Sequence, residues 1–168
     1  MPVQCTEQNL VDRAEAVMRC LREARLSLVT AESCTAGMIS AILSQAEGAG
    51  SCLHGSFVVY TKLHKTAALG VPEALLAEVG SVHAEVARRM AEGALERSPA
   101  DIVLAVTGVT GPAEDEDGNP VGRVIFACGR RGEELHLEDC NFGKNAPDNL
   151  RSLAALHGLG LVERAAAG

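Results

Sequence analysis

Four polar residues, Glu32-Ser33-Cys34-Thr35, lie between two hydrophobic runs early in the sequence. The run before them, "SLVTA", has the character of a short strand, and the run after them, "MISAIL", has helical spacing. A serine in such a turn becomes a nucleophile when a neighbouring base takes its proton. Free N–H groups and the dipole at the start of the helix would stabilise the developing negative charge. The alternative is that Ser33 only caps the helix.

Lys65 is the candidate base for Ser33. The five histidines are scattered, and none belongs to a recognisable triad motif. Serine–lysine pairs occur among hydrolases, but a lysine works as a base near neutral pH only if burial or a nearby cation lowers its pKa. Tyr60, which precedes Lys65, would orient the lysine or relay a proton. The alternative is that Lys65 is a solvated helix lysine, as most lysines are.

Three other features have both a chemical and a plainer interpretation. Cys34 would compete with Ser33 as a nucleophile, because helix N-termini lower thiol pKa values, but it also suits a small buried position. The run "TGVTGP" from Thr107 to Pro112 lets a backbone approach a ligand closely or forms an ordinary turn, and it lacks the lysine of a P-loop. The acidic run Glu114 to Asp117 lacks the spacing of a calcium loop, so we expect a solvated loop. We find no zinc pattern and expect no metal.

The elements that must position these residues follow from hydrophobic periodicity. Helices are predicted at about 6–24, 38–43, 62–69, 82–95 and 150–158, and strands at 26–31, 55–61, 101–106, 121–129 and 133–142. The last two strands are predicted to pair as an antiparallel hairpin. This order indicates helices on both faces of a mixed sheet, in one domain over residues 1–168. If the first three strands are parallel neighbours, their polar ends converge at one edge, where ligands bind in open α/β sheets.

Composition limits the classes of function. The 168 residues are 47% hydrophobic and 22% charged, which is typical of one globular domain. Fifteen basic against 22 acidic residues give a net charge of −7, which argues against nucleic acid as the main partner. No apolar run is long enough to span a membrane, and the N-terminus lacks the features of a signal peptide. The six cysteines form no C-x-x-C pair, which indicates reduced thiols and a cytoplasmic protein.

Taken together, the motifs resemble the CinA C-terminal domain family, whose characterised members are nicotinamide mononucleotide amidohydrolases. The resemblance runs from about residue 10 to residue 156. The motifs that carry it are E-S-C-T-x-G at 32–37, Y-x-x-x-x-K at 60–65, L-G-V-P at 69–72, T-G-x-x-G-P at 107–112 and P-V-G-x-V at 120–124. The resemblance implies a three-layer α/β/α sandwich with a mixed sheet. It also implies a stand-alone version, without the additional N-terminal domain of longer members.

The resemblance further implies a reaction and its residues. Ser33 is the nucleophile, Lys65 the base and Tyr60 a third catalytic residue in the hydrolysis of nicotinamide mononucleotide to nicotinate mononucleotide and ammonia. The implied partner is a small-molecule nucleotide, with no cofactor, no metal, no nucleic acid and no membrane. The oligomeric state stays open, with a homo-oligomer (a dimer or a trimer) among the options. The residues implied to bind substrate are Glu32, Thr35, Gly37, Gly55, Thr107, Gly108, Gly111 and Arg151.

The sequence departs from the family's motifs at positions that bear on the substrate. The departing residues are Ala36, Lys62, His83, Thr110 and Lys144. Lys144 stands in the segment that replaces a late G-D-R motif, so a substrate phosphate contact is either lost or taken over by this lysine. Two other functions therefore stay open. One is a CinA-like binding or accessory protein with little or no turnover, and the other is a hydrolase of a different small amide.

Overall fold

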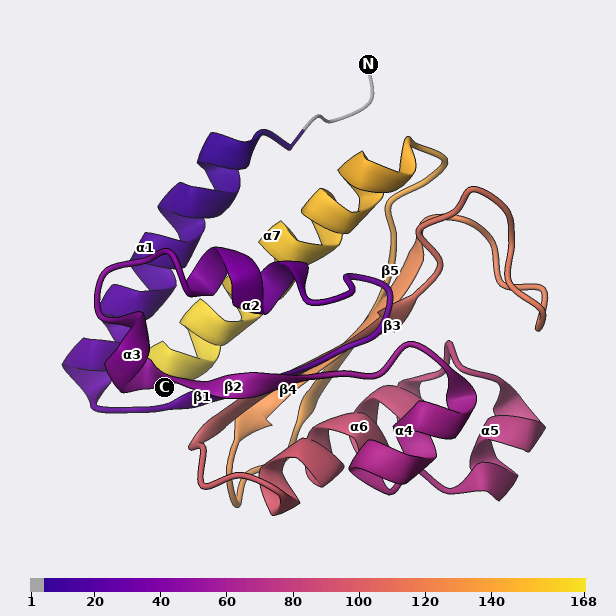
Figure 1. Cartoon of the computed structure of the whole chain (residues 1–168), viewed down its shortest axis with the longest axis horizontal. Helices are drawn as coiled ribbons and strands as arrows, with labels where there is room; N and C mark the ends of the chain where they lie inside the picture. Colours follow the sequence, from indigo (N-terminus) through magenta and orange to yellow (C-terminus); the bar gives the residue numbers. More distant parts are fainter. Residues whose placement is uncertain (1–4) are drawn as a thin grey trace.

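The computed structural model describes residues 5–168 of the chain (Figure 1). Helices and strands alternate along the first half, and three strands follow one another in the second half. In chain order the elements are α1 (Glu7–Ala24), β1 (Leu28–Glu32), α2 (Met38–Leu43), α3 (Ala49–Cys52), β2 (Leu53–Val58), α4 (Lys62–Leu69), α5 (Glu73–Val79), α6 (Ala84–Glu96), β3 (Ile102–Gly108), β4 (Arg123–Arg130), β5 (His136–Asn141) and α7 (Pro147–Ala167).

The strands form one mixed sheet in the order β2-β1-β3-β4-β5. Strand β1 is parallel to both β2 and β3, whereas β4 pairs antiparallel with β3 and β5 antiparallel with β4. The predicted hairpin of the last two strands is therefore confirmed. In the parallel part, Glu32 lies opposite Val58 on one side and Val106 on the other. The three parallel strands thus end at the same edge of the sheet.

Helices cover both faces of the sheet, so the structure is a three-layer α/β/α sandwich (Figure 1). Helices α1, α2 and α7 lie on one face, and α4, α5 and α6 lie on the other. Alternate residues of β3 point to opposite faces, as the period of a strand requires. Ile102 and Leu104 join the core under α1 and α7, and Val103 and Ala105 join the core under α6. Two aliphatic cores therefore hold the edge of the sheet in place.

Two short helices, α3 and α5, were not predicted, and the predicted end of α7 was wrong. Helices α3 and α5 have four and seven residues, too few for a clear apolar stripe. Helix α7 was predicted to end near Gly158, but it continues to Ala167. A Cβ atom on Gly158 would lie 3.0 Å from a methyl group of Leu104, so this glycine permits close packing on the sheet and does not end the helix. Within residues 5–168, no helix is both long enough and apolar enough to cross a lipid bilayer.

Candidate active site

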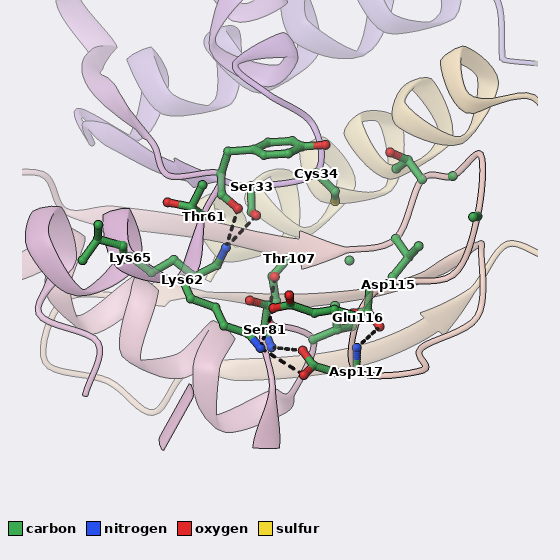
Figure 2. A pocket seen from close by; sticks show the side chains of 18 residues that line it. Ser33, Cys34, Thr61, Lys62, Lys65, Ser81, Thr107, Asp115, Glu116 and Asp117 are labelled. Carbon is green, nitrogen blue, oxygen red and sulfur yellow. Dashed lines mark hydrogen bonds and ion pairs between the residues drawn. The ribbon is translucent and has the colours of Figure 1, made fainter. Parts of the chain in front are cut away.

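A cavity of about 560 Å³ opens at the carboxyl edge of the three parallel strands (Figure 2). Its walls come from the turn after β1, the segment from β2 into α4, the connection before α6 and the long loop after β3. Ser33, Tyr60 and Thr107, the polar residues that follow or end the three strands, all line this cavity. The predicted convergence of the three strand ends is confirmed.

Ser33 and Lys65 are in direct contact inside this cavity. The Lys65 Nζ atom lies 2.8 Å from Ser33 Oγ, and 3.2 Å from the carbonyl oxygens of both Val59 and Tyr60. Lys65 has no exposed surface and Ser33 is 6% exposed. A neutral amine has two N–H groups and one lone pair. With both N–H groups donated to the two carbonyls, the lone pair is directed at the serine hydroxyl.

Burial also adjusts the proton affinity of Lys65. Removal of the amine from water lowers its pKa from 10.5 to about 8, and the nearby charge of Lys62 acts in the same direction. A substantial fraction of Lys65 is therefore neutral near physiological pH. The alternative of a solvated helix lysine was wrong, because helix α4 begins at Lys62 and turns Lys65 inward.

Glu32 has a role that sequence reasoning did not assign. Its buried carboxylate accepts hydrogen bonds from the backbone N–H groups of Gly37, Ile39 and Ser40 at distances of 2.9–3.1 Å. It therefore caps α2, whose N-cap position is Gly37, and the alternative that Ser33 caps this helix was wrong. The expectation that these N–H groups are free to stabilise an oxyanion was also wrong, because Glu32 occupies them. Glu32 lies six residues before the first residue of α2, outside the usual spacing of a capping residue, so only the path of the turn brings its carboxylate to the helix.

Several residues expected at the substrate lie behind the cavity wall. The Thr35 hydroxyl donates to Glu32 at 2.7 Å, so it supports the cap. Gly37 adopts a φ of 91°, and Ala36 before it has a φ of 50°, so two consecutive residues are left-handed in this turn. Glycine adopts this conformation without strain, whereas Ala36 carries a Cβ atom there.

The remaining expected binding residues divide into two groups. Thr107, Gly108 and Gly111 line the cavity, and the Thr107 hydroxyl donates to the carbonyl oxygen of Ser81 at 2.8 Å. Gly55 lies within β2 and Arg151 within α7, and neither lines the cavity. Arg151 forms an ion pair with Asp148 one turn earlier on its own helix.

Two alternatives for the chemistry lose support from the geometry. Cys34 is 5% exposed, and burial raises the pKa of its thiol to about 12, so it stays protonated and is a poor nucleophile. Tyr60 holds Lys65 through its main-chain carbonyl, while the residue itself is 67% exposed. Among the hydrogen bonds of the described residues, none joins the Tyr60 hydroxyl to Lys65. A proton relay through the phenol therefore has no support.

The acidic run contributes to the cavity, contrary to the expectation of a purely solvated loop. Asp115, Glu116 and Asp117 all line it (Figure 2). The Lys62 Nζ atom lies 2.7 Å from a Glu116 carboxylate oxygen and 3.0 Å from one of Asp117. Asp117 also accepts a hydrogen bond from the backbone of Ser81 at 3.3 Å. The loop after β3 is thus fastened to α4 and to the connection before α6.

These features define a class of protein. Proteins of this class have a mixed sheet between two helical layers and a buried serine–lysine pair where the parallel strands end. The match to the model described as "CinA C-terminal domain" covers residues 11–166. The chain belongs to the CinA C-terminal domain family.

Solved structures and curated relatives agree with this assignment. A competence-damaged protein (CinA) superfamily protein from Escherichia coli is 31% identical, with a TM-score of 0.87 over 96% of this chain and 93% of that one. The competence/damage inducible protein from Agrobacterium tumefaciens is 30% identical, with a TM-score of 0.87 over 95% of this chain and 96% of that one. A CinA-like protein from Geobacter sulfurreducens is 44% identical over 73% of this chain and 29% of its own length. The chain spans about a third of the length of the curated relatives it matches.

Proposed function

We propose that this chain is an amidohydrolase that converts nicotinamide mononucleotide to nicotinate mononucleotide and ammonia. One observation carries the proposal: Lys65 Nζ lies 2.8 Å from Ser33 Oγ and is buried, so that its pKa is lowered to about 8. A neutral amine at this distance is a competent general base for a serine hydroxyl. The substrate comes from the resemblance to characterised family members.

The reaction would proceed by acyl transfer. The Ser33 oxygen attacks the carboxamide carbon while its proton moves to Lys65 Nζ. The new ammonium, next to the reacting oxygen, gives its proton to the leaving nitrogen, and ammonia departs from the tetrahedral intermediate. Water then attacks the ester of Ser33, with Lys65 again as the base, and the nicotinate product is released. Because Glu32 occupies the N-terminus of α2, the oxyanion must be stabilised by other donors of the cavity.

The charges around the cavity favour a second candidate substrate. Asp115, Glu116 and Asp117 line the wall with Lys62, which forms ion pairs with Glu116 and Asp117. A phosphate would have to displace these carboxylates to reach Lys62. Arg151, an expected contact for substrate, does not line the cavity. The acidic wall therefore supports an amide without a phosphate group as the alternative substrate.

Ammonia release separates these possibilities. Purified protein is incubated with nicotinamide mononucleotide, with nicotinamide riboside and with nicotinamide, and ammonia is measured by a coupled assay. We expect the highest kcat/KM for the mononucleotide, and a fall of at least about 1,000-fold in kcat for Ser33→Ala and for Lys65→Met. Cys34→Ala is the matched control and keeps most of the activity.

Each contrary outcome identifies a different function. A higher kcat/KM for the riboside would make an amide without phosphate the preferred substrate and would leave the serine mechanism unchanged. Calorimetric binding of the mononucleotide without ammonia release would establish the accessory protein. Full activity in a folded Ser33→Ala variant would exclude the serine mechanism.

We further propose that the reaction takes place in the cytoplasm, because all six cysteines are free, as expected in a reducing compartment. The oligomeric state of the proposed enzyme stays open, with a dimer and a trimer among the options. Size-exclusion chromatography with light scattering measures this state directly.

A further inference from the structure

Strand β5 and helix α7 bring three metal-binding side chains together at the far edge of the sheet. Glu138 and Cys140 occupy alternate positions of β5, so both point to the face covered by α7, where His157 lies. The His157 Nε2 atom is 2.6 Å from Glu138 Oε2 and 3.5 Å from Cys140 Sγ. Cys140 Sγ is 3.9 Å from Glu138 Oε2. All three residues are half-buried, and their ligand atoms lie within 4.8 Å of one another.

The surroundings hold the imidazole and the carboxylate in fixed orientations. The ring of His157 lies 4.9 Å from that of Phe126 and 5.8 Å from that of Phe142, so two of the three phenylalanines in the chain flank it. The other oxygen of Glu138, Oε1, accepts hydrogen bonds from His136 at 2.7 Å and from Arg164 at 3.0 Å. Oε2 is left facing His157 and Cys140. Such outer contacts orient the ligands in known metal sites.

We propose that Glu138, Cys140 and His157 form a binding site for a zinc ion. Thiolate, imidazole and carboxylate are the ligand types that zinc prefers, and a water molecule would complete a tetrahedral set. Zinc bonds of about 2.0–2.3 Å place neighbouring ligand atoms roughly 3.3–3.6 Å apart. The separation of 3.5 Å between Cys140 and His157 already fits. The contact between Glu138 and His157 would open as the ion replaces their hydrogen bond.

Charge and protons balance on binding. The thiol of Cys140 loses its proton to solvent, and a metal bound at Nε2 of His157 leaves a proton on Nδ1. One thiolate and one carboxylate then neutralise the two positive charges of the ion. Binding is therefore expected to release protons and to strengthen as pH rises.

The site has a structural role that is separate from the candidate active site. None of its ligands lines the cavity that holds Ser33 and Lys65. The ion would join β5, an edge strand, to α7 on the adjacent helical layer. Because it binds the folded chain, it would raise stability according to its concentration and affinity. The sequence does not suggest this cluster, because its ligands stand at 138, 140 and 157 on two different elements.

The test uses the intact chain, stripped of metal with a chelator under reducing conditions. Calorimetric titration with Zn²⁺ is expected to give one ion per chain and a higher midpoint of thermal unfolding. Co²⁺ is expected to produce the near-ultraviolet absorption of a thiolate–cobalt bond. Cys140→Ser and His157→Gln should each weaken zinc binding by at least about tenfold. Cys20→Ser and His54→Gln, which change a cysteine and a histidine outside the cluster, should bind as the wild type does.

Three results would overturn the proposal. One is wild-type protein that binds no zinc. Another is equal binding by wild type, Cys140→Ser and His157→Gln. The third is a cobalt spectrum without the thiolate band, which needs no variant and so does not depend on whether a variant folds. Circular dichroism confirms that each variant used in the comparison keeps the fold.

Discussion

Burial beside Ser33 makes Lys65, a residue type usually found at the surface, a candidate general base. Lys65 is expensive to bury as a cation, and the structure surrounds it with carbonyl acceptors and a serine hydroxyl rather than with a carboxylate. A carboxylate partner would hold the lysine charged and useless as a base. Among the described residues, no carboxylate forms a hydrogen bond or ion pair with Lys65, which agrees with its lowered pKa.

The pH dependence of turnover follows from this pKa. Only neutral Lys65 accepts the proton of Ser33, so kcat/KM should rise with pH, about tenfold per pH unit, and level off above pH 8 or so. The charge of Lys62 helps to keep Lys65 neutral, so Lys62→Gln should move the midpoint of the profile upward. Steady-state kinetics at constant ionic strength measure both midpoints. A profile centred near pH 6.5 would instead indicate a histidine base.

The motifs shared with the family indicated Ser33 and Lys65, which the structure brings into contact, but they did not assign Glu32 its partners. Which N–H groups a carboxylate reaches depends on the path of the turn, and here two left-handed residues, Ala36 and Gly37, fold the chain back over Glu32. A left-handed alanine is uncommon and is not expected from its type. For the same reason, Thr35 was assigned to the substrate although its hydroxyl contacts Glu32.

At the scale of elements, Glu32 fixes where α2 begins. Glu32→Gln replaces one acceptor oxygen with an NH₂ group, which would face a backbone N–H donor in a buried site. We expect this change to lower the free energy of unfolding by about 3 kcal/mol. Urea denaturation followed by circular dichroism measures the loss. Glu23→Gln, at an exposed position of α1, is the control, and equal stability of the two variants would show that the cap contributes nothing.

Element existence was easier to predict than element ends. Helix α1 was expected at about 6–24 and runs from Glu7 to Ala24, because its apolar stripe is regular and Thr6 caps it. The end of α7 was predicted wrongly because a glycine can either end a helix or allow the helix to pack closely against its neighbour. Gly158 lies against the sheet, and this contact is seen only in the three-dimensional structure. A single sequence does not distinguish these roles.

At the scale of the molecule, strand order determined the site. The sequence predicted that three polar strand ends would converge if their strands were parallel neighbours, and the order β2-β1-β3 satisfies that condition. It did not predict the contribution of the loop after β3, whose Glu116 and Asp117 reach Lys62 on another element. Such pairings between distant segments leave no periodic signal.

The stability of the whole chain should depend on pH through Lys65. Its pKa is about 8 in the folded chain and near 10.5 when unfolded, so the unfolded chain binds the proton more tightly. The destabilisation caused by the buried Lys65 amine is complete below pH 8 and disappears as pH rises toward 10.5. As pH rises across this range, the free energy of unfolding of the wild type should increase by about 3 kcal/mol relative to that of Lys65→Met. Denaturant unfolding of both proteins at each pH measures the difference, and parallel curves would contradict it.

Under the proposed chemistry, the buried amine would place this fold under two opposing selection pressures. A mutation that replaces Lys65 with an apolar side chain would remove an amine that is costly to bury at neutral pH. Selection for folding alone would therefore eliminate the lysine over generations, and only a benefit from its proton chemistry would retain it. Descendants that no longer need that chemistry are expected to lose Lys65 before Glu32, because the lysine burdens the fold whereas the glutamate supports it.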